Sequence, residues 1–339
     1  MTVGAVPDPA ELAERILGGD RRALARAITL AESTRGDHRD LTAQLLDAVL
    51  PHTGRAVRLG VSGPPGAGKS TFIQAYGLHL VDQMDQRIAV LAVDPTSTQS
   101  GGSILGDKTR MPDLAARQRA FIRPSPAGSG WAGASLGGIA RRTREVLLLC
   151  EAAGSDCVLV ETVGVGQSET AVAGIVDTMA LLLPPASGDD LQGIKRGIME
   201  LADLVVVTKA DGDLLPAARL AAADARQGLS LLRRRHPGWD PQVLLTSALR
   251  GEGITDVAAA VAAHRTHLVE GGQLEGLRRQ QDAGWLMAEV TDGLLEAFRS
   301  DARASAAMDE AMRDVRARTT TPTAAARTLL QTYLHRGSG

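Results

Sequence analysis

A run of eight residues has the composition and spacing of a phosphate-binding loop. It reads Gly63-Pro64-Pro65-Gly66-Ala67-Gly68-Lys69-Ser70, between a short apolar run and an amphipathic segment, which is the context that the pattern G-x-x-x-x-G-K-[ST] requires. Glycines let successive backbone N–H groups turn inward around phosphates, and a helix that starts there adds the positive end of its dipole. We therefore assign these residues and Thr71 to nucleotide binding, with Lys69 as the catalytic cation at the β- and γ-phosphates and Ser70 as a ligand of Mg²⁺.

Two short elements further along predict which base is bound. Thr208-Lys209-Ala210-Asp211 and Ser247-Ala248-Leu249 each follow an apolar run that we expect to be a strand. The Asp211 carboxylate can accept hydrogen bonds from the N1 and N2 donors of guanine, a pair that adenine lacks, while the Lys209 stem packs on the ring. A backbone N–H of the Ser247 turn can contact guanine O6. The sequence therefore predicts GTP rather than ATP, although Thr208 stands where Asn is commoner and makes the base specificity less strict.

A third element, Glu161-Thr162-Val163-Gly164, occupies the place of a sensor of the γ-phosphate. We expect Glu161 to hold Mg²⁺ through water and Gly164 to offer its N–H to the phosphate. Val165 stands where many GTP-hydrolysing proteins have a glutamine that orients the attacking water, so intrinsic hydrolysis should be slow.

The segments around Asp94 and Asp107 fall where a magnesium-facing switch should lie. We expect Asp94 and Asp107 to approach the metal and Arg110 to stabilise charge during catalysis. The alternative interpretation is a simple Asp-Pro turn and a surface arginine.

His264 and His267 are one helical turn apart, but no Cys, Asp or Glu joins them at ligand spacing. We therefore interpret both as solvated helix positions rather than a metal pair. Cys150 and Cys157 each lie in an apolar run and are interpreted as buried structural thiols.

Short apolar runs that alternate with amphipathic segments predict a doubly wound, mostly parallel α/β domain. The expected strands are residues 56–61, 88–93, 157–160, 179–183, 204–207 and 243–245, and the expected helices between them are 69–81, 137–153, 191–201, 216–234 and 255–269. Helices are also expected before residue 51 and beyond residue 271. The predicted organisation is an N-terminal helical segment (1–54), a nucleotide domain (55–270) and a C-terminal helical extension (271–339).

Composition narrows the range of partners. A formal net charge of -2 gives no basic field for bulk nucleic-acid or anionic-membrane attraction. The first residues lack the basic flank and apolar stretch of a signal peptide, and no long apolar run occurs. We expect a cytoplasmic protein that acts on a small molecule or a protein, without nucleic-acid or membrane partners.

Taken together, these motifs closely resemble the MeaB/ArgK family of GTPases, the G-protein chaperones of adenosylcobalamin-dependent acyl-CoA mutases. The resemblance rests on residues 63–70, 93–97, 106–111, 161–169, 190–195 and 209–211 and extends over nearly the whole chain. It implies a homodimer formed through the C-terminal helices, and a third switch at residues 187–197 in which Lys195 is a catalytic group that acts in trans or is triggered by the partner. It also implies that GTP hydrolysis gates the loading of adenosylcobalamin onto methylmalonyl-CoA mutase and the removal of inactivated cofactor, without cobalamin held permanently by this chain.

Two other functions remain open from the residues alone. A metal-delivering maturation GTPase would share the fold and the phosphate loop, but such proteins usually carry His-rich tracts or Cys/His ligand sets, which this sequence lacks. A small-molecule kinase would consume the triphosphate on a substrate, which Lys209-Ala210-Asp211 makes less favoured.

Overall fold

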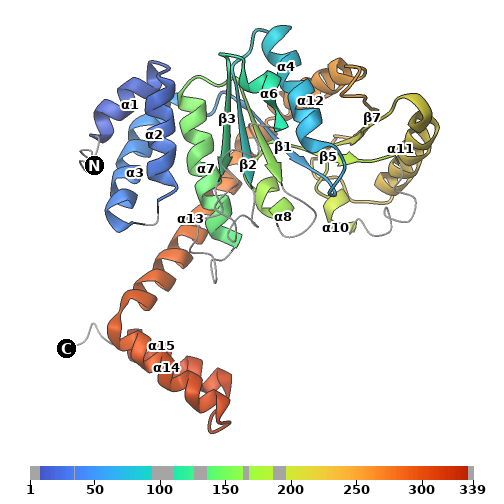
Figure 1. Cartoon of the computed structure of the whole chain (residues 1–339). Helices are drawn as coiled ribbons and strands as arrows, with labels where there is room; N and C mark the ends of the chain where they lie inside the picture. The colour runs from blue at the N-terminus through green and yellow to red at the C-terminus, as the bar shows by residue number, and fades with distance from the viewer. Residues whose placement is uncertain are drawn as a thin grey trace. The chain divides into compact units, whose positions relative to one another are not determined.

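The computed structural model of the chain describes residues 8–33, 35–93, 110–125, 136–162, 168–185 and 196–334. The chain divides into two compact units, Met1–Gln281 and Asp282–Gly339. The first unit holds a sheet with helices packed around it (Figure 1).

The sheet, within the described residues, has seven strands in the order β3-β2-β4-β1-β5-β6-β7. All neighbouring strands pair in parallel, so the expected doubly wound α/β fold is confirmed. The strands are β1 (Val57–Ser62), β2 (Ile88–Val93), β3 (Ala120–Ser125), β4 (Cys157–Thr162), β5 (Thr178–Leu183), β6 (Leu204–Val207) and β7 (Gln242–Leu245).

Strand β3 is absent from the sequence-based expectation. Its apolar run is short and includes Pro124, which cannot donate a ladder hydrogen bond. The strand lies at the edge of the sheet, paired only with β2 among the described strands, and an edge is where proline is tolerated.

Helices cover both faces of the sheet and continue beyond it (Figure 1). In the first unit they are α1 (Pro9–Leu17), α2 (Arg21–Ala31), α3 (Gly36–Val49), α4 (Lys69–Asp82), α6 (Pro112–Ala115), α7 (Leu136–Ala152), α8 (Ser168–Ala173), α10 (Arg196–Met199), α11 (Leu215–Ser230) and α12 (Ile254–Glu270). At the start of α1, Asp8 accepts a hydrogen bond from the Ala10 N–H and Pro9 begins the helix. Of the helix expected at residues 191–201, the described part is α10.

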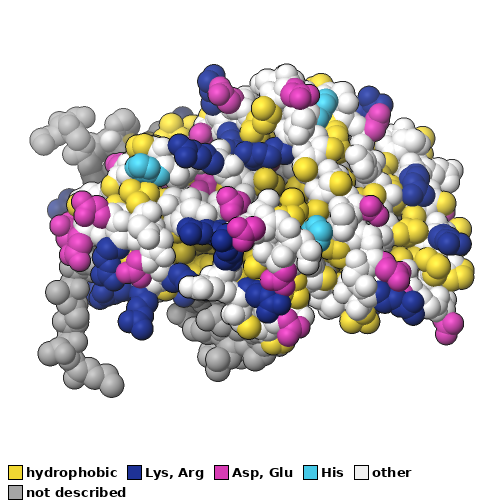
Figure 2. Space-filling view, turned by 90° about the horizontal axis from the view of Figure 1, so that it is seen from above, with side chains coloured by type: hydrophobic (Ala, Val, Ile, Leu, Met, Phe, Trp, Pro, Cys, Tyr) yellow, Lys and Arg dark blue, Asp and Glu magenta, His cyan; other side chains and the backbone are white. Residues whose placement is uncertain are grey.

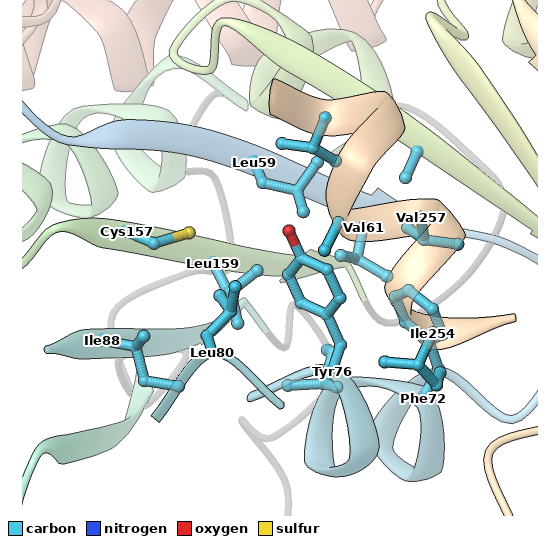
Figure 3. Packing of buried hydrophobic residues seen from close by; sticks show 14 of the residues in the cluster. Leu59, Val61, Phe72, Tyr76, Leu80, Ile88, Cys157, Leu159, Ile254 and Val257 are labelled. Carbon is cyan, nitrogen blue, oxygen red and sulfur yellow. The ribbon is translucent and has the colours of Figure 1, made fainter. Parts of the chain in front are cut away.

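Alternate residues of the central strands face two separate cores. Ala180 and Leu182 of β5 pack with α4, α6 and α12, whereas Leu181 and Leu183 pack with α10 and α11. In the first core the Tyr76 ring projects from α4 toward Leu59 and Val61 of β1, with α12 beside it (Figure 3). Burial of both strand faces explains why these strands are continuously apolar in the sequence.

Both cysteines are buried and free, as predicted. Burial raises the pKa of Cys157 to about 12 and that of Cys150 further, so both thiols are protonated and unreactive at neutral pH.

An aspartate stands directly before each of β4, β5 and β6, and its carboxylate accepts a hydrogen bond from a backbone N–H near the start of the strand beside it. Asp156 Oδ2 accepts from the Arg87 N–H at 2.8 Å, Asp177 Oδ2 from the Arg58 N–H at 3.3 Å, and Asp203 Oδ2 from the Met179 N–H at 2.8 Å. Each carboxylate therefore satisfies an amide at the amino edge of the sheet, where the ladder has ended. The sequence carries this signal as Asp before the runs that begin at residues 157, 178 and 204.

Arg278 anchors the beginning of α13 (Gln273–Ser300) to this edge. Its Nε and Nη2 donate to the two oxygens of Asp177 at 2.9 and 2.7 Å, and the guanidinium also reaches the carbonyls of Gly54 and Ala56. The Asp177 side chain is 1 % exposed and that of Arg278 is 13 % exposed, so the pair is largely removed from water.

The second unit contains the rest of α13 together with α14 (Ala302–Arg316) and α15 (Pro322–Leu334). Asp301 caps α14 by accepting from the Arg303 and Ala304 N–H groups, and residues 317–321 separate α14 from α15. Phe298 packs edge-on against Tyr333, with ring centroids 5.1 Å apart. Among the helices of the described residues, none combines the length and apolarity needed to cross a membrane.

Replacing Arg278 with methionine should lower the free energy of unfolding by about 3 kcal/mol, because the Asp177 carboxylate stays buried without its main partner. The matched control is Arg279→Met on the same helix, whose exposed ion pair with Glu275 should contribute less than about 1 kcal/mol. Urea denaturation measures both variants. Equal losses would contradict the anchoring role of Arg278.

Candidate nucleotide-binding site

The predicted motifs meet at the carboxyl edge of the sheet. The strand order reverses at β1, which has β4 on one side and β5 on the other, and ligands of open α/β sheets bind at such a switch point beyond the carboxyl ends. The segment 63–68 follows β1, Glu161 and Thr162 end β4, Thr208 follows β6, and Ser247 follows β7 by one residue.

The glycines of the loop after β1 adopt backbone conformations that the motif requires. Gly66 and Gly68 have φ of 79° and 82°, in the left-handed region, and Gly68 is the residue that precedes α4. Gly63 has φ of 154°, and a Cβ atom there would lie 2.4 Å from the Leu182 carbonyl oxygen of β5. Only glycine fits this approach of the loop to the neighbouring strand.

Lys69 is folded back over the loop. Its Nζ donates to the carbonyls of Gly63 at 2.7 Å and Pro64 at 3.2 Å. Burial lowers the pKa of the Lys69 ammonium, while the carboxylates of Glu161 and Glu169 act in the opposite direction. The arrangement places a cation inside a ring of backbone groups, where it can attract phosphate oxygens in a partly desolvated setting.

Ser70 and Glu161 provide a matched pair of oxygen ligands. The Ser70 hydroxyl donates to Glu161 Oε1 at 3.1 Å, and Glu161 is 7 % exposed. Behind them, Thr162 Oγ1 donates to Ser62 Oγ at 3.0 Å, and both residues are fully buried. A hydroxyl and a carboxylate that are already within reach of each other fit a hard cation such as Mg²⁺, which prefers oxygen ligands.

The base-recognition segment is tied directly to the phosphate loop. Thr208 Oγ1 donates to the Ala67 carbonyl at 2.7 Å and lies 3.2 Å from the Leu183 carbonyl, and Lys209 Nζ donates to the Gly66 carbonyl at 2.8 Å. Lys209 has φ of 54°, a left-handed conformation that a non-glycine residue holds only at a cost. The threonine that departs from the commoner asparagine therefore anchors the loop.

Asp211 and Ser247 meet at the outer side of the site. The Ser247 hydroxyl donates to Asp211 Oδ2 and accepts from the Arg250 N–H, which fixes the direction of the carboxylate. Ser247 is buried, Ala248 is half-buried and Leu249 is 86 % exposed. The two sequence elements predicted to read guanine are thus brought together, with Asp211 half-exposed toward solvent.

The remaining predicted site residues are only partly described by the structure. Asp94, Asp107, Gly164 and Lys195 lie outside the described residues. Arg110 is described and its side chain is exposed, which leaves its catalytic role a prediction. Thr71 is an exposed residue in the first turn of α4.

Glu169 is a site residue whose role the sequence pattern did not reveal. It lies in the first turn of α8, is fully buried, and contributes to the electrostatic setting of Lys69. The signal in the sequence was an acidic residue near a helix start, close behind the γ-phosphate element.

Comparisons with known proteins place the chain among GTPases. The sequence model of the family described as methylmalonyl Co-A mutase-associated GTPase MeaB matches residues 24–303. The chain is 49 % identical over 322 residues to a putative GTPase of Caulobacter vibrioides, covering 95 % of this chain and 97 % of that protein. It is 49 % identical over 286 residues to GTPase ArgK of Escherichia coli, covering 84 % and 85 %. It is also 48 % identical over 295 residues to the mitochondrial methylmalonic aciduria type A homolog of Mus musculus, covering 84 % and 70 %.

A solved structure described as a LAO/AO transport system kinase has a similar fold. The TM-score is 0.75 at 39 % identity, covering 96 % of this chain and 97 % of that one.

The contact between Gly63 and β5 makes a direct prediction. Gly63→Ala should lower stability by about 3 kcal/mol, because the added methyl group collides with the Leu182 backbone. Gly66→Ala is the matched control and should cost about 1 kcal/mol. Gly66 also has a positive φ, but no atom of the described residues lies within 4 Å of the point that an added Cβ would occupy. Thermal unfolding of both variants without nucleotide separates collision from backbone strain; similar melting temperatures would contradict the close approach.

Proposed function

Because this chain belongs to the family of methylmalonyl Co-A mutase-associated GTPases, MeaB, we propose that it hydrolyses GTP to control an adenosylcobalamin-dependent acyl-CoA mutase. The observation that carries the proposal is the junction of the phosphate loop with the base-recognition segment, through Thr208 to Ala67 and Lys209 to Gly66.

In the proposed complex, backbone N–H groups of residues 63–70 surround the α- and β-phosphates, and Lys69 turns from the loop carbonyls to the β- and γ-phosphates. Ser70 binds Mg²⁺ directly and Glu161 holds it through water. This assignment is supported by the 3.1 Å contact between these two side chains. Magnesium would neutralise charge that develops when water attacks the γ-phosphorus and the bond to the bridging oxygen breaks.

Guanine would be read by Asp211, which accepts from N1 and N2, while Lys209 covers the ring. The hydrogen bond from Ser247 to Asp211 supports this proposal, because it orients the acceptor before the base arrives. A preorganised acceptor loses less entropy on binding.

The partner that we propose is methylmalonyl-CoA mutase or a related acyl-CoA mutase. Support comes from the description of the family and from the name of the mouse relative. Contacts that depend on the γ-phosphate would distinguish two mutase-binding states. We propose that Asp94 and Asp107 act on the magnesium side, that Gly164 senses the γ-phosphate, and that Arg110 and Lys195 stabilise charge, with Lys195 responding to the partner.

Cobalamin would belong to the mutase, and the GTPase would time its entry and the exit of inactivated cofactor. The cytoplasmic location expected from the sequence stays a prediction.

We also propose that the chain forms a homodimer through residues 271–339. Leu286, Val290 and Leu294 recur every fourth residue of α13 and are 63, 47 and 58 % exposed, a spacing that aligns them on one helix face. A continuous exposed apolar face of this kind is typical of a protein interface.

The base assignment predicts a change of nucleotide preference. Asp211→Asn should weaken GDP binding about 100-fold, because the charged acceptor of two hydrogen bonds is lost. The same variant should gain affinity for xanthosine diphosphate, since an asparagine amide can donate to the carbonyl that xanthine carries in place of the guanine amino group. Asp213→Asn, two residues away and exposed, is the control. Isothermal titration measures the affinity of each variant for GDP and for xanthosine diphosphate. If Asp211→Asn still prefers GDP to xanthosine diphosphate as wild type does, the assignment of Asp211 to guanine recognition is wrong.

The partner proposal predicts that phosphate release from GTP is slow and rises at least about tenfold when methylmalonyl-CoA mutase from the same source is added. ATP should be a poor substrate with or without mutase. Lys195→Ala should keep the basal rate but lose most of the stimulation, while Lys69→Ala should abolish both. Stimulation that is equal in Lys195→Ala and wild type would remove Lys195 from the mechanism. Turnover that is indifferent to the mutase would leave the GTPase activity and exclude this partner.

A further inference from the structure

A second cluster of chemically active side chains lies at the amino edge of the sheet, opposite the nucleotide site. Asp203 directly precedes β6, His236 comes from the segment between α11 and β7, and His264 comes from α12. They are 1, 5 and 0 % exposed, and one ligand atom of each lies within 4.8 Å of the others. This corrects the prediction that His264 is a solvated helix position.

Three atoms of the cluster face one another, and none of them has a hydrogen-bond partner among the residues that the structure describes. They are Asp203 Oδ1, His236 Nε2 and His264 Nε2, and the two nitrogens lie 3.4 and 3.8 Å from the carboxylate oxygen. A buried polar atom without a partner costs free energy, so native structures rarely retain several at one point. Three such atoms converging on one volume therefore indicate that the volume is made for a polar ligand.

Surrounding groups hold these atoms in place. Asp203 Oδ2 accepts from the Met179 N–H at 2.8 Å and from Arg235 at 2.6 Å, which leaves Oδ1 for the cluster. His264 Nδ1 lies 2.7 Å from Thr178 Oγ1, and a proton on Nδ1 that is donated to this hydroxyl leaves the Nε2 lone pair for the cluster. Hydrogen bonds on the far atom of each ligand are the usual supports of metal-binding residues.

The chemistry of these atoms selects the class of ligand. Burial lowers the pKa of His236 to about 4 and that of His264 to about 3, so both rings are neutral and able to act as electron-pair donors. Two imidazoles and one carboxylate suit zinc and similar transition metals, whereas Mg²⁺ and Ca²⁺ prefer all-oxygen sites.

We propose that Asp203, His236 and His264 form a binding site for a divalent transition-metal ion of the zinc class. Tetrahedral zinc with bonds of about 2.1 Å places its ligand atoms about 3.4 Å apart, close to the separation of His236 Nε2 from Asp203 Oδ1. The His264 nitrogen, 3.8 Å from Asp203 Oδ1, has to move inward for the ion to bind. The positive charge of Arg235 opposes the ion and makes the site weaker than one with an uncompensated carboxylate.

The ion would connect the start of β6, the segment before β7, and α12. Strands β6 and β7 lead to the segments 208–211 and 247–249, which are predicted to recognise the base. Strand β6 connects Asp203 to Thr208, and β7 lies between the segment of His236 and Ser247. Its role is structural, because the ligands are buried and leave no open face for a substrate. The inference stands apart from the proposed GTPase mechanism, which uses none of these residues.

The test uses the full chain without a histidine tag, stripped with a chelator and then kept in Mg²⁺ and GDP so that oxygen-ligand sites are filled. Co²⁺ is added as a spectroscopic probe and then displaced by Zn²⁺, and bound metal is measured by elemental analysis. His236→Gln removes one ligand. The control is His267→Gln on α12, the helix that carries His264, where His267 packs against Trp239 outside the cluster.

We expect one Co²⁺ per chain with the intense visible absorption of tetrahedral coordination, lost in His236→Gln and kept in His267→Gln. Zinc at about 100 times its dissociation constant should raise the melting temperature of wild type by about 5 °C and leave that of His236→Gln unchanged.

Metal uptake no greater in wild type than in His236→Gln would overturn the proposal and assign the cluster to a buried water. Loss of uptake in His267→Gln would place the ion elsewhere. Circular dichroism and GDP binding of the metal-free variants distinguish a lost ligand from a lost fold.

Discussion

The parallel direction of all the described strands is the constraint on which the rest of the structure depends. It gathers every carboxyl end at one edge of the sheet and every amino end at the other, so each edge has unpaired backbone groups of one kind to satisfy. At the amino edge, Asp156, Asp177 and Asp203 accept from amides of the adjacent strand. The two buried charges, Asp177 and Asp203, then require cations, which the flanking segments supply as Arg278 and Arg235. Figure 2 shows the molecule from above, and acidic and basic side chains are mixed over this face.

At the carboxyl edge, the parallel direction of the strands brings the predicted nucleotide-binding segments together. The loop after β1 has glycines where the backbone must turn, and its carbonyls are held by Lys69, Lys209 and Thr208. The phosphate loop is therefore supported by the strand that also carries the base-recognition segment. A nucleotide that draws Lys69 away from the loop carbonyls would exchange internal bonds for bonds to phosphate, without rebuilding the loop.

The sequence predicts features whose residues are buried on all sides or lie next to one another in the chain. It does not predict features that form between residues far apart in the chain. The central strands are predicted because both faces are buried and their sequences are continuously apolar, whereas β3 is missed because an edge strand tolerates Pro124. The phosphate loop is predicted because all its parts are contiguous. The prediction for His264 is wrong because it considers only His267 as a partner; the spacing of His264 from Val257, Val261 and Leu268 places it on the buried face of α12. Asp203 and His236 approach it only through folding, which no local pattern shows.

The three aspartates of the amino edge provide an internal comparison for the proposed metal site. Asp156 is exposed, so water can reach its carboxylate. Asp177 is buried, and Arg278 binds both of its oxygens. Asp203 is equally buried, but its Arg235 and Met179 partners share Oδ2 while Oδ1 faces two imidazole nitrogens. All three aspartates use one oxygen to accept from the backbone of the adjacent strand. The other oxygen is accessible to water in Asp156 and is bound by Arg278 in Asp177. Asp203 has this oxygen directed at neutral ring nitrogens, and a cation is the ligand that would satisfy all three atoms at once.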